Sequence, residues 1–197
     1  MKLLVYGGAF DPLHNGHVDI IQYLLRLDEY DRLCVVPTGM PVYKPRTMFT
    51  ADVRTQMLNV LFKDDPKVDI CEYETERLQT SYTVNTVSYL MAHYDVKTLT
   101  LVVGFDQLFQ FHRWREYDHI LNVCDLLVIP RDGIDQSLLM RSFPKELEGY
   151  KHRFDFHDIL PDSISSSRIR LMIQKGESIQ GLVPDKILSI IQEYGGT

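Results

Sequence analysis

Short runs of apolar, often β-branched residues alternate along the chain with longer amphipathic segments. The apolar runs are predicted strands, at Leu3–Tyr6, Arg32–Pro37, Val68–Cys71, Leu99–Val103, Leu126–Ile129 and Arg153–His157. Strands that alternate with helical segments are typical of βα units around a parallel sheet. We therefore predict an α/β fold, a doubly wound Rossmann-like parallel sheet with flanking helices, in a single domain over residues 1–197.

Polar residues at the start of the amphipathic segments indicate where the helices begin. The predicted helices start near Gly16, after Thr50, at Thr83, at Ser165 or Ser166, and near Pro184. Asn15 is expected to cap the first one, because its side-chain oxygen can accept hydrogen bonds from first-turn amides. Gly176 is placed to end the fourth helix, and Pro184 suits a first turn, where its missing amide costs nothing. Residues 131–152 predict only a mixed peripheral region.

The segment after the first strand is the first candidate for ligand binding. In doubly wound folds, ligands lie beyond the carboxyl ends of the strands, where the strand order reverses. Gly7 and Gly8 allow a tight turn and a close approach of the backbone to a ligand. His14 and His17 then flank Gly16 at a predicted helix start, where amides and the helix dipole attract anions. This arrangement predicts a phosphate pocket. The alternative is a plain turn whose histidines are surface or capping residues.

The second candidate is the serine-rich start of the fourth predicted helix. Three hydroxyls, from Ser165 to Ser167, and the nearby amides can hold phosphate oxygens, and Arg170 can add a bidentate contact. Arg168 and Arg170 are two residues apart, so only one of them is expected to face the ligand. The alternative is an ordinary serine-capped helix with solvated arginines. Neither candidate segment has the glycine spacing of a dinucleotide fingerprint or the Gly-Lys-Ser/Thr of a P-loop.

Composition and charge limit the possible partners. The net charge of −6 argues against a general binder of nucleic acid or of anionic membranes, since both need broad positive fields. The three cysteines, Cys34, Cys71 and Cys124, lie far apart without a C-x-x-C spacing, so they support neither a zinc site nor a redox motif. The first apolar run is too short for a signal peptide, and no run is long enough to span a bilayer. We therefore expect a cytoplasmic protein with no nucleic-acid or membrane partner.

Taken together, the two candidate segments resemble the signatures of the nucleotidylyltransferase superfamily. Residues 7–17 match G-G-[ST/A]-F-D-P-x-H-x-G-H, and residues 164–170 match I-S-S-T-x-I-R with Ser167 in place of threonine. Within the superfamily, the chain is most similar to bacterial nicotinate-nucleotide adenylyltransferases over nearly its full length. The similarity includes residues 36–38, 41–45, 81–86 and 104–106, together with Trp114 and Ile120.

The resemblance implies adenylyl transfer from ATP to nicotinate mononucleotide, which gives nicotinate adenine dinucleotide and pyrophosphate in NAD biosynthesis. It implies catalytic roles for His14, His17 and Arg170. It assigns ATP binding to Gly7, Gly8, Ala9, Phe10, His14, His17, Gly104, Asp106, Ser165, Ser166, Ser167 and Arg170. It assigns the mononucleotide to Lys44, Tyr82, Thr83 and Trp114. Mg2+ is expected to bind mainly through the ATP phosphates, and no protein side chain is identified as a metal ligand.

The residues on the nicotinate side fit this assignment physically. Trp114 stands among charged residues, where an exposed indole could stack on a pyridine ring. Backbone amides at the helix start at Thr83 favour a carboxylate. They therefore favour nicotinate mononucleotide over nicotinamide mononucleotide. Trp114 could instead pack a peripheral helix, and Lys44 could be merely solvated. Three departures from the family pattern, Asn85, Arg115 and the Pro-Val-Tyr-Lys sequence of residues 41–44, also fall on this side.

Three alternatives remain open. The acceptor could be nicotinamide mononucleotide, from which the arguments on Thr83 and Trp114 separate the acid only moderately. Phosphopantetheine adenylyltransferases share the reaction, but they usually carry Thr-x-Gly-His where this chain has His14 to His17, and they are typically shorter. A non-catalytic nucleotide sensor on the same fold would bind ATP without turnover. The sequence leaves the oligomeric state open, and a homo-oligomer remains possible.

Overall fold

The core of the molecule is one six-stranded sheet in which all neighbouring strands are parallel. The computed structural model describes residues 1–39, 47–77, 80–129, 143–157, 159 and 164–195. The strand order is β3-β2-β1-β4-β5-β6. The strands are β1 (Lys2–Gly8), β2 (Arg32–Pro37), β3 (Val68–Ile70), β4 (Thr98–Gly104), β5 (Cys124–Ile129) and β6 (Phe154–Phe156). The predicted α/β, doubly wound fold is confirmed.

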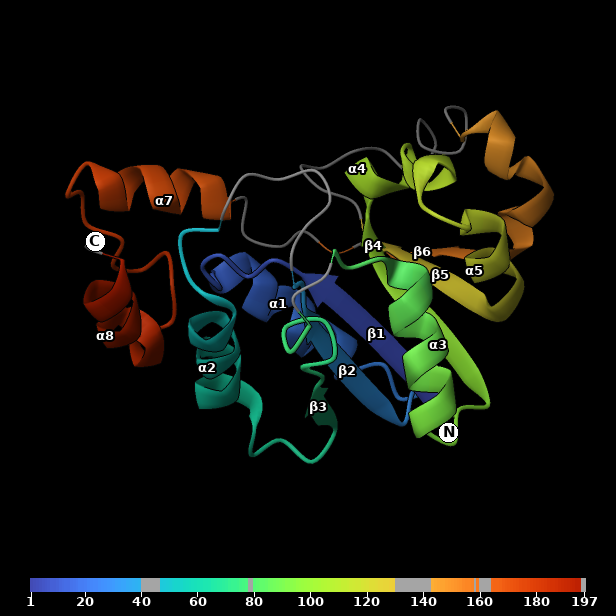
Figure 1. Cartoon of the computed structure of the whole chain (residues 1–197), viewed down its shortest axis with the longest axis horizontal. Coiled ribbons are helices and arrows are strands. Elements are labelled where there is room, and N and C mark those ends of the chain that lie inside the picture. Colours follow the sequence, from blue (N-terminus) through green and yellow to red (C-terminus); the bar gives the residue numbers. More distant parts are fainter. Residues whose placement is uncertain (40–46, 78–79, 130–142, 158, 160–163, 196–197) are drawn as a thin grey trace.

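Helices cover both faces of this sheet (Figure 1). One face carries α1 (Asn15–Leu24), α2 (Ala51–Phe62) and α8 (Asp185–Tyr194), and α8 packs against α2. The other face carries α3 (Thr83–His93), α5 (Tyr117–Val123) and the 3-10 helix η2 (Lys145–Arg153). The remaining helices are α4 (Phe105–Leu108), η1 (Phe111–Arg113) and α7 (Ser166–Gln174). None of the described helices combines the length and the apolar character needed to span a bilayer.

The strand residues alternate between two separate hydrophobic cores. In β1, Leu4 and Tyr6 pack into the core beneath α1 and α2, while Leu3 and Val5 pack into the core beneath α3. The same alternation continues in β2, β4 and β5. Side chains of successive strand residues point to opposite faces, so a sheet covered on both faces needs continuous apolar runs. This requirement explains why the predicted strands read as unbroken apolar segments.

The strand order reverses between β1 and β4, which pair in parallel at the centre of the sheet. The chain runs from β1 to β2 on one side, and later from β4 to β5 on the other. The segments that follow β1 and β4 therefore diverge at the carboxyl edge of the sheet, which is where such folds bind ligands. They begin at Ala9 and at Phe105, respectively.

Most predicted helix boundaries agree with the structure, and two differ. Thr50 caps α2 and Ser165 caps α7, each by accepting a hydrogen bond from a first-turn amide. Asn15 was expected to cap α1, which is wrong: His14 is the capping residue, without a side-chain cap bond. The side-chain amide of Asn15 instead donates to the Gly181 carbonyl, 2.8 Å away, and so ties α1 to the chain before α8. Pro184 is itself the N-cap of α8, one position before the first turn.

Candidate active site

The loop after β1 is a tight turn closed over a buried phenylalanine. A Cβ atom at Gly8 would lie 2.9 Å from the Phe10 ring, so glycine is required there. Phe10 has a φ of +48°, a left-handed conformation that is unusual for a bulky residue and costs free energy. Its ring is fully buried and packs edge-on against His17, with the ring centroids 5.0 Å apart. Any contact of Phe10 with ATP would therefore involve its backbone.

His14 and His17 lie together at the N-terminus of α1. Their imidazoles are stacked, with ring centroids 3.7 Å apart and planes 25° from parallel. His14 is 6% exposed, and its backbone carbonyl accepts the amides of His17 and Val18 in the first turn of the helix. The two rings lie beside the positive end of the helix dipole, at the sheet edge where such folds bind ligands. The spacing of three residues thus produces one compact pair of imidazoles, as the sequence predicted.

Helix α7 meets the loop after β1, although the two segments are about 155 residues apart in sequence. The Ser166 hydroxyl donates to the Pro12 carbonyl at 2.9 Å. Arg170 donates through Nη1 to the Asp11 carbonyl at 2.6 Å, and through Nη2 to the Ser167 hydroxyl at 3.1 Å. The structure thus brings the two predicted phosphate-binding segments side by side. Arg170 is the arginine that faces the loop, whereas Arg168 is exposed.

Asp11 is a buried carboxylate whose role the sequence analysis did not identify. It is 3% exposed, and its two oxygens accept the amides of Met48 at 3.0 Å and Phe49 at 2.9 Å. It also forms an ion pair with Arg170, with Nη1 and Oδ2 3.4 Å apart. Asp11 therefore joins the loop after β1, the segment before α2, and α7. The signal available in the sequence was its fixed place in the Phe-Asp-Pro part of the first motif.

Arg54 and Glu74 form a second buried polar group that was not predicted. Arg54 is 2% exposed and donates through Nη1 to the Ala9 carbonyl at 2.7 Å. Burial lowers the pKa of Arg54, and the nearby charges of Asp11 and Glu74 oppose this shift. Glu74 accepts from the Thr86 hydroxyl at 2.6 Å and from the Gly39 amide at 3.3 Å. An arginine among the apolar positions of α2, next to Val53, was the signal that could have revealed this group.

The residues expected to bind the mononucleotide follow β4 and begin α3. Thr83 is the first residue of α3, as expected, and Tyr82 is its N-cap residue, without a side-chain cap bond. The Arg115 guanidinium lies 4.8 Å from the centre of the Tyr82 ring, which brings the chain after η1 against the start of α3. Trp114 is half-buried instead of exposed, because one side packs on Phe111 with the ring centroids 4.7 Å apart.

Gly104 and Asp106, the predicted residues where β4 ends, lie at the start of α4. Gly104 caps α4, and Asp106 lies exposed in the first turn of that helix. The Asp106 carboxylate accepts a hydrogen bond from the side-chain amide of Gln107 at 2.9 Å. Lys44 lies outside the described residues, as does the whole segment 41–45.

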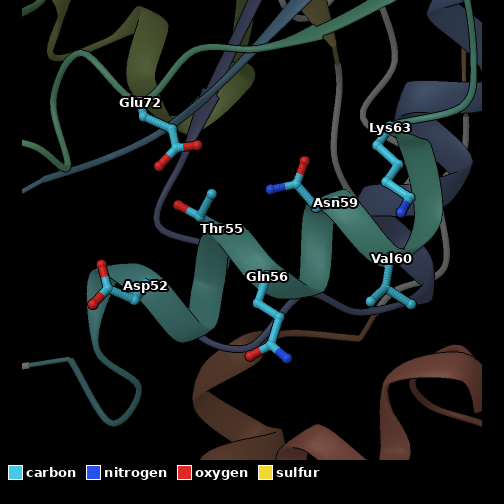
Figure 2. A pocket seen from close by; sticks show the side chains of 7 residues that line it. All are labelled: Asp52, Thr55, Gln56, Asn59, Val60, Lys63 and Glu72. Carbon is cyan, nitrogen blue, oxygen red and sulfur yellow. The ribbon is translucent and has the colours of Figure 1, made fainter.

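A separate hollow of about 400 Å3 lies on the outer side of α2 (Figure 2). The side chains that line it come from α2, from Lys63 at its end and from Glu72: they are Asp52, Thr55, Gln56, Asn59, Val60, Lys63 and Glu72. None of them belongs to the predicted site. In the part of the chain that the structure describes, no group of three or more His, Cys, Asp or Glu side chains is arranged to hold a metal ion. Cys34, Cys71 and Cys124 are buried free thiols.

Comparisons with known proteins identify the family to which the chain belongs. Residues 5–172 match the family described as cytidylyltransferase-like. A protein of Clostridium tetani named probable nicotinate-nucleotide adenylyltransferase is 31% identical over 195 residues, covering 98% of both chains. A protein of the same name from Thermotoga petrophila is 32% identical over 195 residues, covering 99% of this chain and 97% of the relative.

Solved structures give the same architecture. The nicotinic acid mononucleotide adenylyltransferase of Plasmodium falciparum, solved with NaAD, superposes with a TM-score of 0.74 at 20% identity. The superposition covers 98% of this chain and 95% of that one. At this level of identity the likeness concerns the fold alone. The family match over most of the chain and the full-length relatives carry the assignment, and the chain belongs to the cytidylyltransferase-like family of nucleotidyltransferases.

Proposed function

We propose that this protein is a nicotinate-nucleotide adenylyltransferase, which joins the adenylyl group of ATP to nicotinate mononucleotide. One observation carries the proposal: Arg170 of α7 bonds Asp11 beside the stacked pair His14 and His17. Cationic and hydrogen-bonding groups from both ends of the chain therefore converge where the sheet order reverses. Such a convergence suits a polyphosphate, and the full-length relatives carry this activity in their names. The proposed domain is the whole chain, residues 1–197.

The proposed reaction is a direct transfer. An oxygen of the mononucleotide 5′-phosphate attacks the α-phosphorus of ATP in line. A new P–O–P bond forms as the bond to the bridging oxygen breaks, and pyrophosphate leaves with that electron pair. The attacking phosphate is already an anion at neutral pH, so no protein nucleophile is required. Catalysis then consists of positioning the two phosphates and stabilising the charge that develops between them.

Each residue of the site has one proposed role in that reaction. His17 stabilises charge on the α-phosphate, and its stacking on His14 fixes the ring at the start of α1. His14 orients the triphosphate. Arg170 and the serines of α7 hold the departing pyrophosphate, with the Asp11 contact fixing the guanidinium. Gly7, Gly8 and the Ala9–Phe10 backbone border the phosphates, while Gly104 and Asp106 approach the ribose.

ATP is proposed to enter as its Mg2+ complex. Mg2+ bound to the ATP phosphates would neutralise part of their negative charge. The protein's own contribution is the cationic and amide groups described above.

The acid is proposed to be selected at the start of α3. The first-turn amides of a helix have no partner inside the helix, and they form the positive end of its dipole. Thr83 and Tyr82 provide that end, so a carboxylate on the pyridine ring would be bound there and a neutral amide less well. Trp114 is proposed to offer its uncovered side to the ring, and Lys44 to approach the phosphate. We also propose a cytoplasmic location, because three free thiols suit a reducing compartment.

The test is to incubate the purified protein with ATP, Mg2+ and nicotinate mononucleotide, and to quantify dinucleotide and pyrophosphate together. The proposal predicts equimolar amounts of both, formed at a rate proportional to enzyme concentration. Phosphopantetheine, assayed in parallel, is expected to give no product. ATP binding without pyrophosphate from any of these acceptors would contradict the proposal and favour a nucleotide sensor.

A further inference from the structure

Arg54 is the most deeply buried charged side chain among the described residues, and the reaction proposed above assigns it no role. It lies in the first half of α2 with 2% of its surface exposed. Arginine is almost never buried to this extent unless its charge and its N–H groups are paired, because desolvating a guanidinium is costly. A stable α2 could carry an apolar residue at this position. The burial of Arg54 therefore calls for a specific partner.

Its strongest contact is with the turn that borders the proposed ATP phosphates. Nη1 donates to the Ala9 carbonyl at 2.7 Å. The C=O and N–H of a trans peptide point in opposite directions. Holding the Ala9 carbonyl toward Arg54 therefore directs the Phe10 amide away from α2. That amide belongs to the residue with a φ of +48°, a conformation that persists only when surrounding contacts fix it.

Two carboxylates next to Arg54 connect it with both sides of the site. Asp11 and Glu74 are buried, and each interacts electrostatically with the guanidinium. Asp11 holds Arg170 on the ATP side. Glu74 holds the amide of Gly39 and the hydroxyl of Thr86 in α3, the helix whose start is proposed to bind the mononucleotide. Arg54 thus lies between the groups proposed to hold the two substrates.

The contact pattern distinguishes this arginine from one that only stabilises the fold. Within the described residues, Nε of Arg54 is buried without a hydrogen-bond acceptor. An arginine selected for stability alone would be expected to satisfy this group, because an unpaired buried donor costs free energy. Arg54 instead keeps its short bond to the turn. Polar groups kept at such a cost are frequent at functional sites.

We propose that Arg54 is a positioning residue for adenylyl transfer, which fixes the Ala9–Phe10 peptide with its N–H toward the ATP phosphates and links that turn to Asp11 and Glu74. The inference rests on the proposed function, and it adds a residue that touches neither substrate. It predicts that the loss of Arg54 lowers kcat more than it raises KM, because both substrates still bind but the reacting atoms are misaligned. A misplacement of about 1 Å can cost on the order of 100-fold in rate.

The test compares Arg54→Lys and Arg54→Ala with Arg32→Ala as the matched control. Arg32 also pairs with a carboxylate, Asp69 at 2.7 Å, but it lies at the opposite, amino edge of the sheet. Thermal unfolding and ATP titration in the absence of acceptor are measured for every variant. We expect Arg54→Lys to fold, to bind ATP within a few-fold of wild type, and to lose about 100-fold in kcat. Arg32→Ala should retain wild-type kcat.

Chemical rescue provides a second readout that an unfolded variant would not give. Free guanidinium added at millimolar concentration should raise kcat of Arg54→Ala at least several-fold, whereas ammonium at the same ionic strength should not. A wild-type kcat in Arg54→Lys would overturn the inference. It would also be overturned if the activity lost in Arg54→Lys and Arg54→Ala were fully explained by a smaller fraction of folded protein. Absence of turnover in the wild type would refute the proposed function instead. The positioning role in adenylyl transfer would then fall with it, and the two failures remain distinguishable because only the failure of the proposed function abolishes turnover in the wild type.

Discussion

Asp11 is the residue at which the two halves of the candidate site meet. Its carboxylate accepts hydrogen bonds from two backbone amides and forms an ion pair with Arg170. Its backbone carbonyl accepts a hydrogen bond from the same arginine. A carboxylate buried with this many donors is held in one orientation. The guanidinium of Arg170 is thereby fixed, although its side chain is 31% exposed. A fixed cation at the surface can meet a phosphate with little loss of side-chain entropy.

His17 is expected to contribute most strongly to the chemical step. Replacing His17 with alanine should lower kcat by about 100- to 1,000-fold, the usual cost of removing one group that stabilises transition-state charge. Pyrophosphate release measures the effect, and far-UV circular dichroism checks the fold. His119→Ala is the matched control, because His119 is exposed on α5. A His17→Ala enzyme with turnover close to the wild type would refute the role proposed for this histidine.

Among the elements, three helices direct their N-termini toward the carboxyl edge of the sheet. They are α1, α3 and α7, which begin at Asn15, Thr83 and Ser166. Each start presents first-turn amides and a positive dipole end. In the proposed complex they place three anion-favouring groups around substrates that carry phosphates and a carboxylate. This arrangement lets a protein with a net charge of −6 bind anions locally.

Substitutions of Ser165 test the stability of α7 and its proposed anion binding separately. Its hydroxyl accepts the Arg168 amide at 3.3 Å and so caps the helix. Ser165→Ala should lower the free energy of unfolding by about 1 kcal/mol and raise KM for ATP. Ser165→Asp keeps a capping oxygen but adds a negative charge, so it should preserve stability while weakening ATP binding further. Urea unfolding and ATP titration measure the two quantities. Equal ATP affinity in Ser165→Asp and the wild type would place the phosphates elsewhere.

Trp114 offers a direct probe of the mononucleotide side, because it is the only tryptophan in the chain. Its indole packs on Phe111 at the end of η1. Stacking of a pyridine ring on its uncovered side should quench the intrinsic fluorescence in a saturable manner as nicotinate mononucleotide is added. ATP alone should cause a much smaller change. Fluorescence that stays constant while turnover saturates would place the pyridine ring away from Trp114.

The sequence predicted elements best where a regular pattern was sustained, and it missed those fixed by tertiary contacts. The six strands and the starts of α2, α3 and α7 follow from apolar runs and capping residues. Asn15 was misjudged because its side chain bonds Gly181, which no local pattern indicates. The short helices α4, η1 and α5 lack enough turns to show a periodicity. The role of Arg54 was not predicted for a similar reason, because its hydrogen-bond partner Ala9 is 45 residues away in sequence.

At the scale of the whole molecule, two hydrophobic cores stabilise the sheet and leave its carboxyl edge polar. Cys124 lies fully buried in the core beneath α3, while Cys34 and Cys71 occupy the same core. Burial raises the pKa of the Cys124 thiol to about 12, from an ordinary value of 9.0. The folded protein therefore retains a proton that the unfolded chain releases in this range.

This difference sets the direction of the pH dependence at alkaline pH. A group whose pKa is raised by folding contributes its stability below the unfolded pKa, and that contribution is lost as pH rises toward the folded pKa. The melting temperature should consequently fall as pH rises from 9.0 toward 12, and Cys124→Ala should fall less steeply than the wild type. Calorimetry between these pH values measures both slopes. Parallel slopes would show that the Cys124 thiol does not contribute to the alkaline loss of stability.

The most direct measurement of the central claim is the ratio of kcat/KM for nicotinate mononucleotide to that for its amide, with ATP and Mg2+ at saturation. Both acceptors carry the same phosphate and ribose, so the ratio isolates the group on the pyridine ring. The account predicts a clear preference for the acid, at least about 10-fold, the effect of one charge-assisted interaction worth about 1.4 kcal/mol. Equal use of both acceptors would contradict the carboxylate site at the start of α3. Absence of turnover with either acceptor would contradict the proposed adenylyl transfer itself.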